Sequence, residues 1–314
     1  MDSTTQKRAH AITGAFGFTG KYLAQRLLDS GERVVTLTGS ANRPDPFGGR
    51  VEARPLSFDN AKALAAALAD VQVLYNTYWV RFNHDDFSYA QAARNSLILF
   101  EAAKKAGVER VVHISITNAE PNSPYEYFSA KGHLEKALQG FGLNHAVLRP
   151  AVLFGPEDIL INNIAWAVRR FPLLGMAGDG AYRLRPIYVD DLAALMLQQG
   201  QERENVSINA LGPEEFTYRE LLELVAFALG KSPRLVAMNP KILYAFSRFL
   251  GLLLDDVLLT RDEIGALSDN LLTVPGAQAT GTVALSAWVR EHASELGKVY
   301  HAELDRRRNR DRAY

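Results

Sequence analysis

Cysteine is absent from the 314 residues of this chain, and that absence removes several classes of function. A chain without thiols forms no disulfides, holds no metal through thiolates and uses no cysteine nucleophile. An excess of one charge is also missing, because 35 lysines and arginines balance 35 aspartates and glutamates. A chain without a net basic charge is not expected to bind nucleic acid. The sequence also gives no reason to expect a metal site.

The chain lacks a hydrophobic run long enough to cross a bilayer. Its longest apolar stretch, residues 242–254, is interrupted by Ser247 and Arg248 and is shorter than the ~20 residues that a spanning helix needs. This stretch could form an amphipathic helix on a membrane surface, but we expect it to pack against its own domain. The first eight residues are polar and do not form the apolar core of a secretory signal. We therefore expect an intracellular, cytoplasmic protein.

Three glycines spaced three residues apart, Gly14, Gly17 and Gly20, lie between a short apolar run and a helical pattern. The first turn of a helix leaves backbone N–H groups unpaired, and these can hold a pyrophosphate if no side chain blocks its approach. Gly14 would form the turn, Gly17 would let the backbone approach the phosphates, and Gly20 would let the helix lie close to its strand. Helical periodicity continues over 21–28, and 33–37 reads as the next strand. The sequence therefore predicts a dinucleotide site rather than an ordinary flexible turn.

Strand-like and helix-like patterns alternate after the glycine motif. The alternating segments are 51–56, 61–69, 71–75, 87–106, 110–116, 125–139 and 145–148. Strands rich in Val, Ile and Leu and separated by helices predict an α/β fold, with a doubly wound parallel sheet covered on both faces. A ligand would then bind at the carboxyl ends of the strands, where the strand order reverses.

The alternation gives way to helix-rich sequence from about residue 155 onward. Capping-box patterns occur at 217–220 and 260–263, and Asn239 precedes a proline that can begin a helix. We expect a dinucleotide-binding domain over 1–155, to which later segments return, and a smaller, mainly helical substrate lobe over 156–314.

Tyr127 and Lys131 lie four residues apart in the segment 125–139, so they share one face if the segment is a helix. A phenol with an ordinary pKa of about 10 exchanges protons poorly near neutral pH, but an adjacent ammonium and an oxidised nicotinamide both favour the phenolate. Tyr127 would then protonate a carbonyl oxygen as hydride arrives, or deprotonate an alcohol as hydride leaves. Because this spacing is common in helices, a surface Tyr–Lys pair is the alternative.

Two hydroxyl residues, Ser115 and Thr117, follow the strand that precedes this helix. Either could hydrogen-bond the reacting oxygen, since a hydroxyl both donates and accepts. Either could equally well satisfy the backbone at the end of the strand. His113 lies within the apolar run of the strand, and we interpret it as a core residue rather than a ligand.

An acidic residue is missing from the end of the second strand, where an NAD site usually places an Asp or Glu that bonds the adenosine ribose. Thr38 and Ser40 offer hydroxyls there instead, and the guanidinium of Arg43 could pair with a 2′-phosphate. The sequence therefore favours NADP(H) over NAD(H). The alternative is that Arg43 points into solvent before Pro44.

The order of these motifs resembles that of the extended and atypical short-chain dehydrogenases/reductases. The resemblance covers most of the chain and rests on the glycine motif at 13–20, on Tyr127 with Lys131, and on Asp59, Asn95, Ser115, Arg149 and Pro150. The segments 153–156 and 186–192 look like those of epimerase-like members. The segment 162–166 is similar to the atypical subgroup that includes the 39 kDa accessory subunit of respiratory complex I. In one departure, Ile116 separates Ser115 from Thr117, where epimerase-like enzymes commonly carry two successive hydroxyl residues.

This resemblance implies a Rossmann core, a nicotinamide cofactor and a C-terminal substrate lobe. It also implies that Asp59 contacts the adenine, that Asn95 braces the active-site helix and that Pro150 lies near the nicotinamide. The candidate catalytic residues are Tyr127, Lys131, Ser115 and Thr117. The candidate cofactor contacts are Thr13, Gly14, Phe16, Gly17, Phe18, Gly20, Ser40, Arg43, Asp59, Asn76, Thr77, Asn95, Lys131 and Pro150.

Three functions fit these residues. The first is an NADP(H)-dependent reductase or epimerase-like enzyme that acts on a carbonyl or secondary alcohol of a small-molecule substrate. The second is a nucleotide-sugar epimerase or dehydratase with a recycled NAD, against which the missing acid weighs. The third is a non-catalytic dinucleotide-binding sensor or an accessory subunit of a larger assembly. Trp79, Arg81 and Phe82 would suit an extended apolar ligand, or would simply pack, so the sequence sets neither the substrate nor the oligomeric state.

Overall fold

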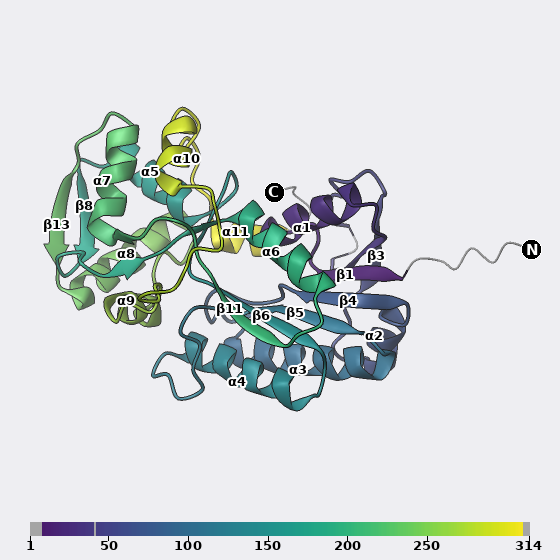
Figure 1. The fold of residues 1–314 in the computed structure, drawn as a ribbon. Coiled ribbons are helices and arrows are strands. Elements are labelled where there is room, and N and C mark those ends of the chain that lie inside the picture. Colours follow the sequence, from purple (N-terminus) through teal and green to yellow (C-terminus); the bar gives the residue numbers. More distant parts are fainter. Residues whose placement is uncertain (1–7, 41, 310–314) are drawn as a thin grey trace, which may run out of the picture. The chain divides into compact units, whose positions relative to one another are not determined.

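The computed structural model describes residues 8–40 and 42–309. Their contacts group into two compact units, whose elements are labelled in Figure 1. The first unit holds the described residues up to Arg149 together with Leu192–Ile208. The second unit holds Pro150–Asp191 and the described residues from Asn209 onward. Over residues 8–40 and 42–309, the chain therefore passes from the first unit to the second, returns once, and passes to the second again.

A seven-stranded sheet in the order β11-β6-β5-β4-β1-β2-β3 forms the centre of the first unit. The strands are β1 (Ala9–Thr13), β2 (Val34–Thr38), β3 (Val51–Pro55), β4 (Val71–Asn76), β5 (Arg110–Ile114), β6 (His145–Pro150) and β11 (Val206–Ala210). The pairs from β6 across to β3 are parallel, and β1 pairs with both β2 and β4. The strand order reverses at the β1–β4 pair. The doubly wound Rossmann architecture expected from the sequence is confirmed, and its ligand position lies at the carboxyl ends of β1 and β4.

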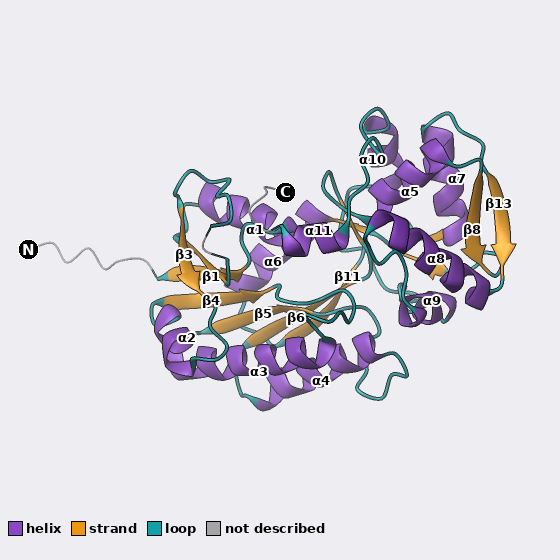
Figure 2. Ribbon diagram, turned by 180° about the vertical axis from the view of Figure 1, so that it is seen from behind, coloured by secondary structure: helices purple, strands orange, loops and turns teal. Residues whose placement is uncertain are grey.

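Helices cover both faces of this sheet. They are α1 (Phe18–Asp29), α2 (Ala61–Ala67), α3 (Tyr89–Ala106), α4 (Glu126–Gly140) and α6 (Val189–Gln201). Both views show α2, α3 and α4 along one face, with α1 and α6 on the other (Figures 1 and 2). The segments expected from residue 51 to residue 148 coincide with these elements to within two residues at each end. A buried apolar core fills the space between the α2–α4 layer and the strands, with Leu74, Leu99 and Phe100 fully inaccessible to solvent.

The second unit is mainly helical. Its helices are α5 (Leu160–Arg170), α7 (Tyr218–Ala228), α8 (Pro240–Leu254), α9 (Arg261–Ser268), α10 (Leu285–Glu291) and α11 (Glu303–Arg308). Its short strands are β7 (Leu153–Phe154), β8 (Leu173–Ala177), β9 (Arg183–Leu184), β10 (Ile187–Tyr188), β12 (Phe216–Thr217) and β13 (Arg234–Met238). They form three two-stranded pairs, β10 with β7, β12 with β9 and β13 with β8. Buried apolar side chains from these helices and strands form a hydrophobic core within the second unit itself.

The helix starts of the second unit follow the capping chemistry in the sequence. Thr217 and Glu220 form a complete capping box at the start of α7, and Thr260 and Glu263 form another at the start of α9. Asn239 accepts a hydrogen bond from the N–H of Lys241, and proline occupies the first turn of α8. The local sequence therefore sets the beginnings of these three helices.

The longest apolar stretch of the sequence forms α8, and only one face of this helix packs against its own unit. Leu243, Ser247 and Gly251 are buried there, whereas the opposite face carries large apolar side chains that are at least half exposed. The segment thus packs against its own unit, as expected, but through one face only. None of the helices in 8–40 and 42–309 is long and apolar enough to pass through a membrane.

Asp158, in the loop before α5, is a fully buried carboxyl. Its Oδ1 accepts a hydrogen bond from the N–H of Ile161 at 2.7 Å, whereas Oδ2 has no hydrogen-bond partner in the described part of the chain. Burial raises the pKa of Asp158 to about 7. The native state therefore holds a proton that the unfolded chain releases above its ordinary pKa of about 3.9. The stability contributed at this position falls as pH rises from about 4 to 7.

We expect Asp158→Asn to stabilise the protein at pH 8 and to change little at pH 4. The amide keeps an oxygen that accepts the hydrogen bond from Ile161, but it removes the free-energy cost of holding or ionising a buried acid. Each kcal/mol of unfolding free energy recovered in this way raises Tm by roughly 2–4 °C. Thermal unfolding at the two pH values measures the difference, with Asp85→Asn at an exposed position as the control. An equal Tm difference at both pH values would contradict this account.

Candidate functional site

The glycine motif forms a tight turn between β1 and α1. Gly14 has a φ of +81°, in the left-handed region that favours glycine, and its carbonyl accepts from the N–H of Gly17 at 2.9 Å. A β-carbon on Gly20 would lie 2.1 Å from the Gly14 carbonyl oxygen. Gly17 caps α1 without any side-chain hydrogen bond. The first amides of α1 thus meet no capping side chain, and the turn fits an anionic diphosphate.

Thr13 and Asn76 tie together the carboxyl ends of the central strands. The Thr13 hydroxyl donates to Asn76 Oδ1 at 3.2 Å and accepts from the backbone N–H groups of Thr77 and Tyr78 at 2.8 and 3.0 Å. The Asn76 amide nitrogen lies 3.1 Å from His113 Nδ1. His113 is fully buried in β5, and burial lowers its pKa. These side chains therefore lie together at or near the carboxyl ends of β1, β4 and β5, where the candidate site is located.

The remaining candidate contacts discussed for the first half of the chain lie in the glycine turn, in α1 and in the loops after β2 and β3. Phe16 is buried against Phe47, with ring centroids 6.2 Å apart, and Phe18 meets Tyr22 edge-on. The N–H of Ser40 donates to the Thr38 hydroxyl at 3.0 Å, directly after β2. The backbone N–H of Arg43 donates to the Ser40 carbonyl at 3.4 Å. Asp59 is exposed between β3 and α2.

Lys131 lies buried on α4 beside the end of β5. Its ammonium nitrogen donates to the carbonyl oxygen of Ile114 at 2.7 Å and lies 4.2 Å from the centroid of the Trp79 ring. Burial lowers the pKa of Lys131 to about 7, and the charge of Glu135 opposes that shift. A lysine held in this way changes its charge near neutral pH, as groups at reactive sites often do.

Tyr127 lies one turn before Lys131 on the same face of α4, is partly buried and belongs to an aromatic cluster. Its ring meets the ring of Trp79 edge-on at 5.9 Å and that of Tyr89 at 5.5 Å. Trp79 therefore contacts both members of the Tyr127–Lys131 pair. The sequence leaves Trp79 either in a substrate pocket or in a packing role and does not indicate this contact, because its position depends on how the loop after β4 folds.

Ser115 and Thr117 are both buried just beyond β5, with Ile116 between them. The N–H of Ser115 donates to the carbonyl of Leu148 at 2.7 Å. The Ser115 hydroxyl oxygen has no hydrogen-bond partner within the described ranges. A buried hydroxyl in this state is costly unless water or a ligand satisfies it. Ser115 directly follows Ile114, whose carbonyl oxygen accepts the hydrogen bond from Lys131.

Asn95 and Arg149 connect the helices, strands and loops around the site through hydrogen bonds. The Asn95 amide donates to the hydroxyl of Tyr78 at 2.8 Å and accepts from Gln91 at 2.7 Å, so its hydrogen bonds run to the loop after β4 and to its own helix. Arg149 Nε donates to both carboxylate oxygens of buried Glu135, at 3.0 and 3.1 Å. This ion pair joins β6 to α4, and the buried Pro150 ends β6.

Glu135 belongs to this group of side chains, although it is not among the residues expected from the sequence. It stands four residues after Lys131 in α4 and is buried, so its charge acts on Lys131 while its carboxylate anchors Arg149. The signal was present in the sequence, because Tyr127, Lys131 and Glu135 repeat every four residues and so form one row on the helix.

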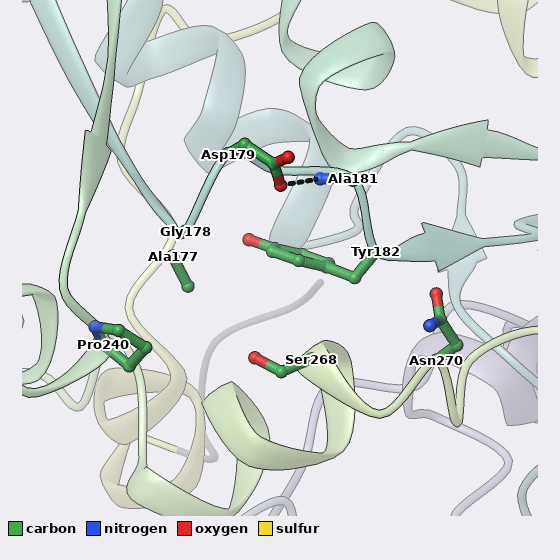
Figure 3. Close-up of a pocket in the computed structure, with 8 residues that line it drawn as sticks. All are labelled: Ala177, Gly178, Asp179, Ala181, Tyr182, Pro240, Ser268 and Asn270. Atoms are coloured by element: carbon green, nitrogen blue, oxygen red, sulfur yellow. Dashed lines mark hydrogen bonds between the residues drawn. The ribbon is translucent and has the colours of Figure 1, made fainter.

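A hollow of about 290 Å³ lies within the second unit (Figure 3). Its lining residues are Ala177, Gly178, Asp179, Ala181, Tyr182, Pro240, Ser268 and Asn270. The Tyr182 ring extends across it (Figure 3). This ring stacks on that of Tyr218, with centroids 5.3 Å apart. Burial raises the pKa of Tyr182. The phenol therefore stays protonated, as a hydrogen-bond donor, over the whole physiological pH range.

Comparisons with known proteins identify the family of this chain. Residues 10–210 match the model of the NAD dependent epimerase/dehydratase family. The chain is 26% identical to the mitochondrial NADH dehydrogenase [ubiquinone] 1 alpha subcomplex subunit 9 of Arabidopsis thaliana, over 85% of this chain and 71% of that protein. It is also 26% identical to the ceramide reductase of Caulobacter vibrioides, over 77% of this chain and 78% of that protein.

A solved structure shares the fold. The UDP-glucose 4-epimerase of Thermus thermophilus, in complex with NAD, superposes with a TM-score of 0.60 at 20% identity, over 84% of this chain and 98% of that one. The family model covers more than half of the chain and includes the glycine turn, Ser115, Tyr127 and Lys131. The chain therefore belongs to the NAD dependent epimerase/dehydratase family, the epimerase-like branch of the extended short-chain dehydrogenases/reductases that its motif order resembles.

Proposed function

We propose that the protein is an NADP(H)-dependent oxidoreductase that reduces a carbonyl group or oxidises the corresponding secondary alcohol. The observation that carries the proposal is the convergence at the end of β5. There the buried Ser115 hydroxyl lacks a partner in the described chain, the Ile114 carbonyl holds Lys131, and Trp79 contacts both Lys131 and Tyr127. The relative in Caulobacter vibrioides that is named a ceramide reductase supports the reductive direction.

Each residue has a distinct part in this chemistry. The nicotinamide, when bound, supplies or accepts the hydride. Tyr127 transfers the proton to or from the substrate oxygen. Lys131 in its charged form stabilises the Tyr127 phenolate, and Ser115 hydrogen-bonds the substrate oxygen and orients it. The Gly14 turn and the first amides of α1 hold the diphosphate.

A panel of carbonyl compounds tests the proposal. The nucleotide that copurifies with the protein is first identified by mass spectrometry, and oxidation of NADPH is then followed with aldehydes and ketones of increasing apolar length. We expect turnover with at least one class. Tight nucleotide binding without turnover on the whole panel would contradict the proposed activity.

The choice of NADP(H) rests on the chain after β2. Thr38 and Ser40 stand where an NAD site usually has an acid, and Arg43 follows on the same loop. A charged hydrogen bond to a 2′-phosphate contributes about 1.5–3 kcal/mol. The alternative cofactor is NAD, which the Thermus thermophilus epimerase holds.

We expect Arg43→Ala to weaken NADPH binding by about tenfold or more, which corresponds to ~1.4 kcal/mol. NADH binding should change much less, because NADH has no 2′-phosphate. Calorimetric titration with both nucleotides measures the difference, and Arg50→Ala on the same loop is the matched control. Equal wild-type affinities for NADH and NADPH, unchanged in Arg43→Ala, would contradict the choice of cofactor.

A second candidate function is an accessory subunit that binds the dinucleotide without turnover. The relative in Arabidopsis thaliana is named as a subunit of NADH dehydrogenase, which supports membership of a larger assembly. The amine of Lys131 already contacts a backbone carbonyl and the Trp79 ring. These contacts are compatible with a site that binds the dinucleotide without catalysing a reaction. The same carbonyl panel separates the two functions, since an accessory subunit would retain the nucleotide and reduce nothing.

A further inference from the structure

The exposed face of α8 carries five of the ten large apolar side chains that are exposed on the described surface, and the proposed function leaves it unused. Its large apolar side chains retain half or more of their accessible surface: Ile242 59%, Phe246 50%, Phe249 59%, Leu252 81% and Leu253 68%. Four of them, at 242, 246, 249 and 253, follow the three- and four-residue spacing of one helical face. Isolated exposed apolar residues are ordinary, but a continuous stripe of this kind marks an interaction surface.

The opposite face fixes the orientation of the helix. Leu243, Ser247 and Gly251 are buried, and a β-carbon on Gly251 would lie 2.5 Å from the carbonyl oxygen of Asp256. Ser247 donates its hydroxyl proton to the Tyr244 carbonyl at 2.9 Å. The helix is therefore held closely on this side, and its apolar stripe faces away from the packed side.

The charges on α8 are all positive. Lys241 and Arg248 are its only charged residues, and at 100° per residue both fall on the same border of the apolar stripe. Arg261 lies 5.0 Å from the ring of Tyr244, which falls near that same border. Long basic side chains beside an apolar stripe can reach lipid phosphates while the stripe enters the acyl region.

The acids that follow α8 do not cancel these charges. Asp255 forms an ion pair with Arg308 at 2.8 Å. Asp256 is buried and accepts from the hydroxyl of Tyr300 and from the N–H groups of Glu303 and Leu304 at the start of α11. Each of these carboxylates is thus bound by groups of the protein itself.

We propose that α8 docks on the surface of an anionic lipid bilayer, with its apolar stripe in the interface and Lys241 and Arg248 on the headgroup phosphates. Charge complementarity favours this occupant over a second copy of the chain. In a symmetric dimer through this face, the basic borders of two helices would meet without an acid from either helix to pair with them. An anionic bilayer offers both an apolar layer and negative charge in one surface.

Cosedimentation with lipid vesicles tests this proposal. We expect the full chain to bind vesicles of phosphatidylcholine with phosphatidylglycerol, and to bind less at high salt, since screening weakens the attraction of Lys241 and Arg248 to phosphate. The double variant Phe249→Glu with Leu253→Glu should lose about tenfold or more of this binding. The control Leu97→Glu, at an exposed leucine of α3, should bind like the wild type.

The basic border is tested separately. Lys241→Gln with Arg248→Gln should lose the preference for anionic vesicles and bind them no better than vesicles of phosphatidylcholine alone. Nucleotide affinity and Tm, measured for every variant, establish that the fold is retained. Three results would overturn the proposal: no binding of the wild type to anionic vesicles, equal binding by the double glutamate variant, or a wild-type dimer in solution that this variant converts to a monomer.

Discussion

Tyr127→Phe is expected to lower the rate of hydride transfer by about 10²- to 10⁴-fold, the range typical for loss of a positioned proton donor. The substitution removes one oxygen and keeps the ring. The contacts of that ring with Trp79 and Tyr89 therefore persist, and the aromatic cluster keeps its packing. Since nucleotide binding depends on the glycine turn rather than on this phenol, the affinity for NADPH should remain within about twofold.

Single-turnover kinetics with the best substrate of the carbonyl panel measure this effect, because they separate hydride transfer from product release. Tyr125→Phe is a matched control, since it removes the same atom two residues away, at the N-terminal cap of the same helix. Equal rates for wild type and Tyr127→Phe would exclude Tyr127 as the proton donor. Loss of activity in both tyrosine variants would instead indicate a general effect on the start of α4.

The parts of the fold that the sequence predicted are those that local chemistry decides. The glycine turn needs a positive φ at residue 14 and the absence of a β-carbon at residue 20, and these two positions are only six residues apart in the chain. Helix starts at Thr217 and Thr260 likewise depend on a hydroxyl and a carboxylate three residues apart. Strand alternation extends over longer segments, but its period is also a local property.

The details of the site that escaped prediction depend on residues far apart in the sequence. Trp79 meets Lys131 only because the loop after β4 and the helix after β5 converge at the edge of the sheet. Asn95 is implied by the resemblance to brace the active-site helix, whereas its hydrogen bonds reach Tyr78 and Gln91. Motif order carries no information about such contacts, since side chains from several loops compete for the same space.

The helix α8 illustrates a different limit. Its apolar residues predict a helix, and its length excludes a membrane span, but periodicity alone does not say which apolar face is covered. The structure shows Leu243 inside and Leu252 outside, nine residues apart. The tertiary position of α8 decides this, because only one side of the helix meets its own unit.

Gly20→Ala should weaken dinucleotide binding and destabilise the first unit. Its β-carbon would lie 2.1 Å from the Gly14 oxygen, 2.8 Å from the Gly14 carbonyl carbon and 2.9 Å from Ala15 Cα. All three atoms belong to the backbone, so no side-chain rotation relieves the overlap. The turn or the start of α1 must move, at a cost of about 1–3 kcal/mol. If the movement carries the amides away from the diphosphate, this cost corresponds to about 5- to 160-fold in affinity.

Titration with NADPH and thermal unfolding together separate the two consequences. Gly140→Ala at the end of α4 is the matched control, because a β-carbon there would meet nothing within 4 Å and the glycine has no positive φ. A folded Gly20→Ala variant with wild-type affinity would show that the diphosphate does not rest on this turn. A lower Tm that NADPH restores fully would instead locate the damage in the empty protein, since a ligand stabilises only the state that it binds. The expected result is a lower Tm without ligand and a smaller rise in Tm on adding NADPH than in the wild type, because the strain persists in the state that must hold the diphosphate.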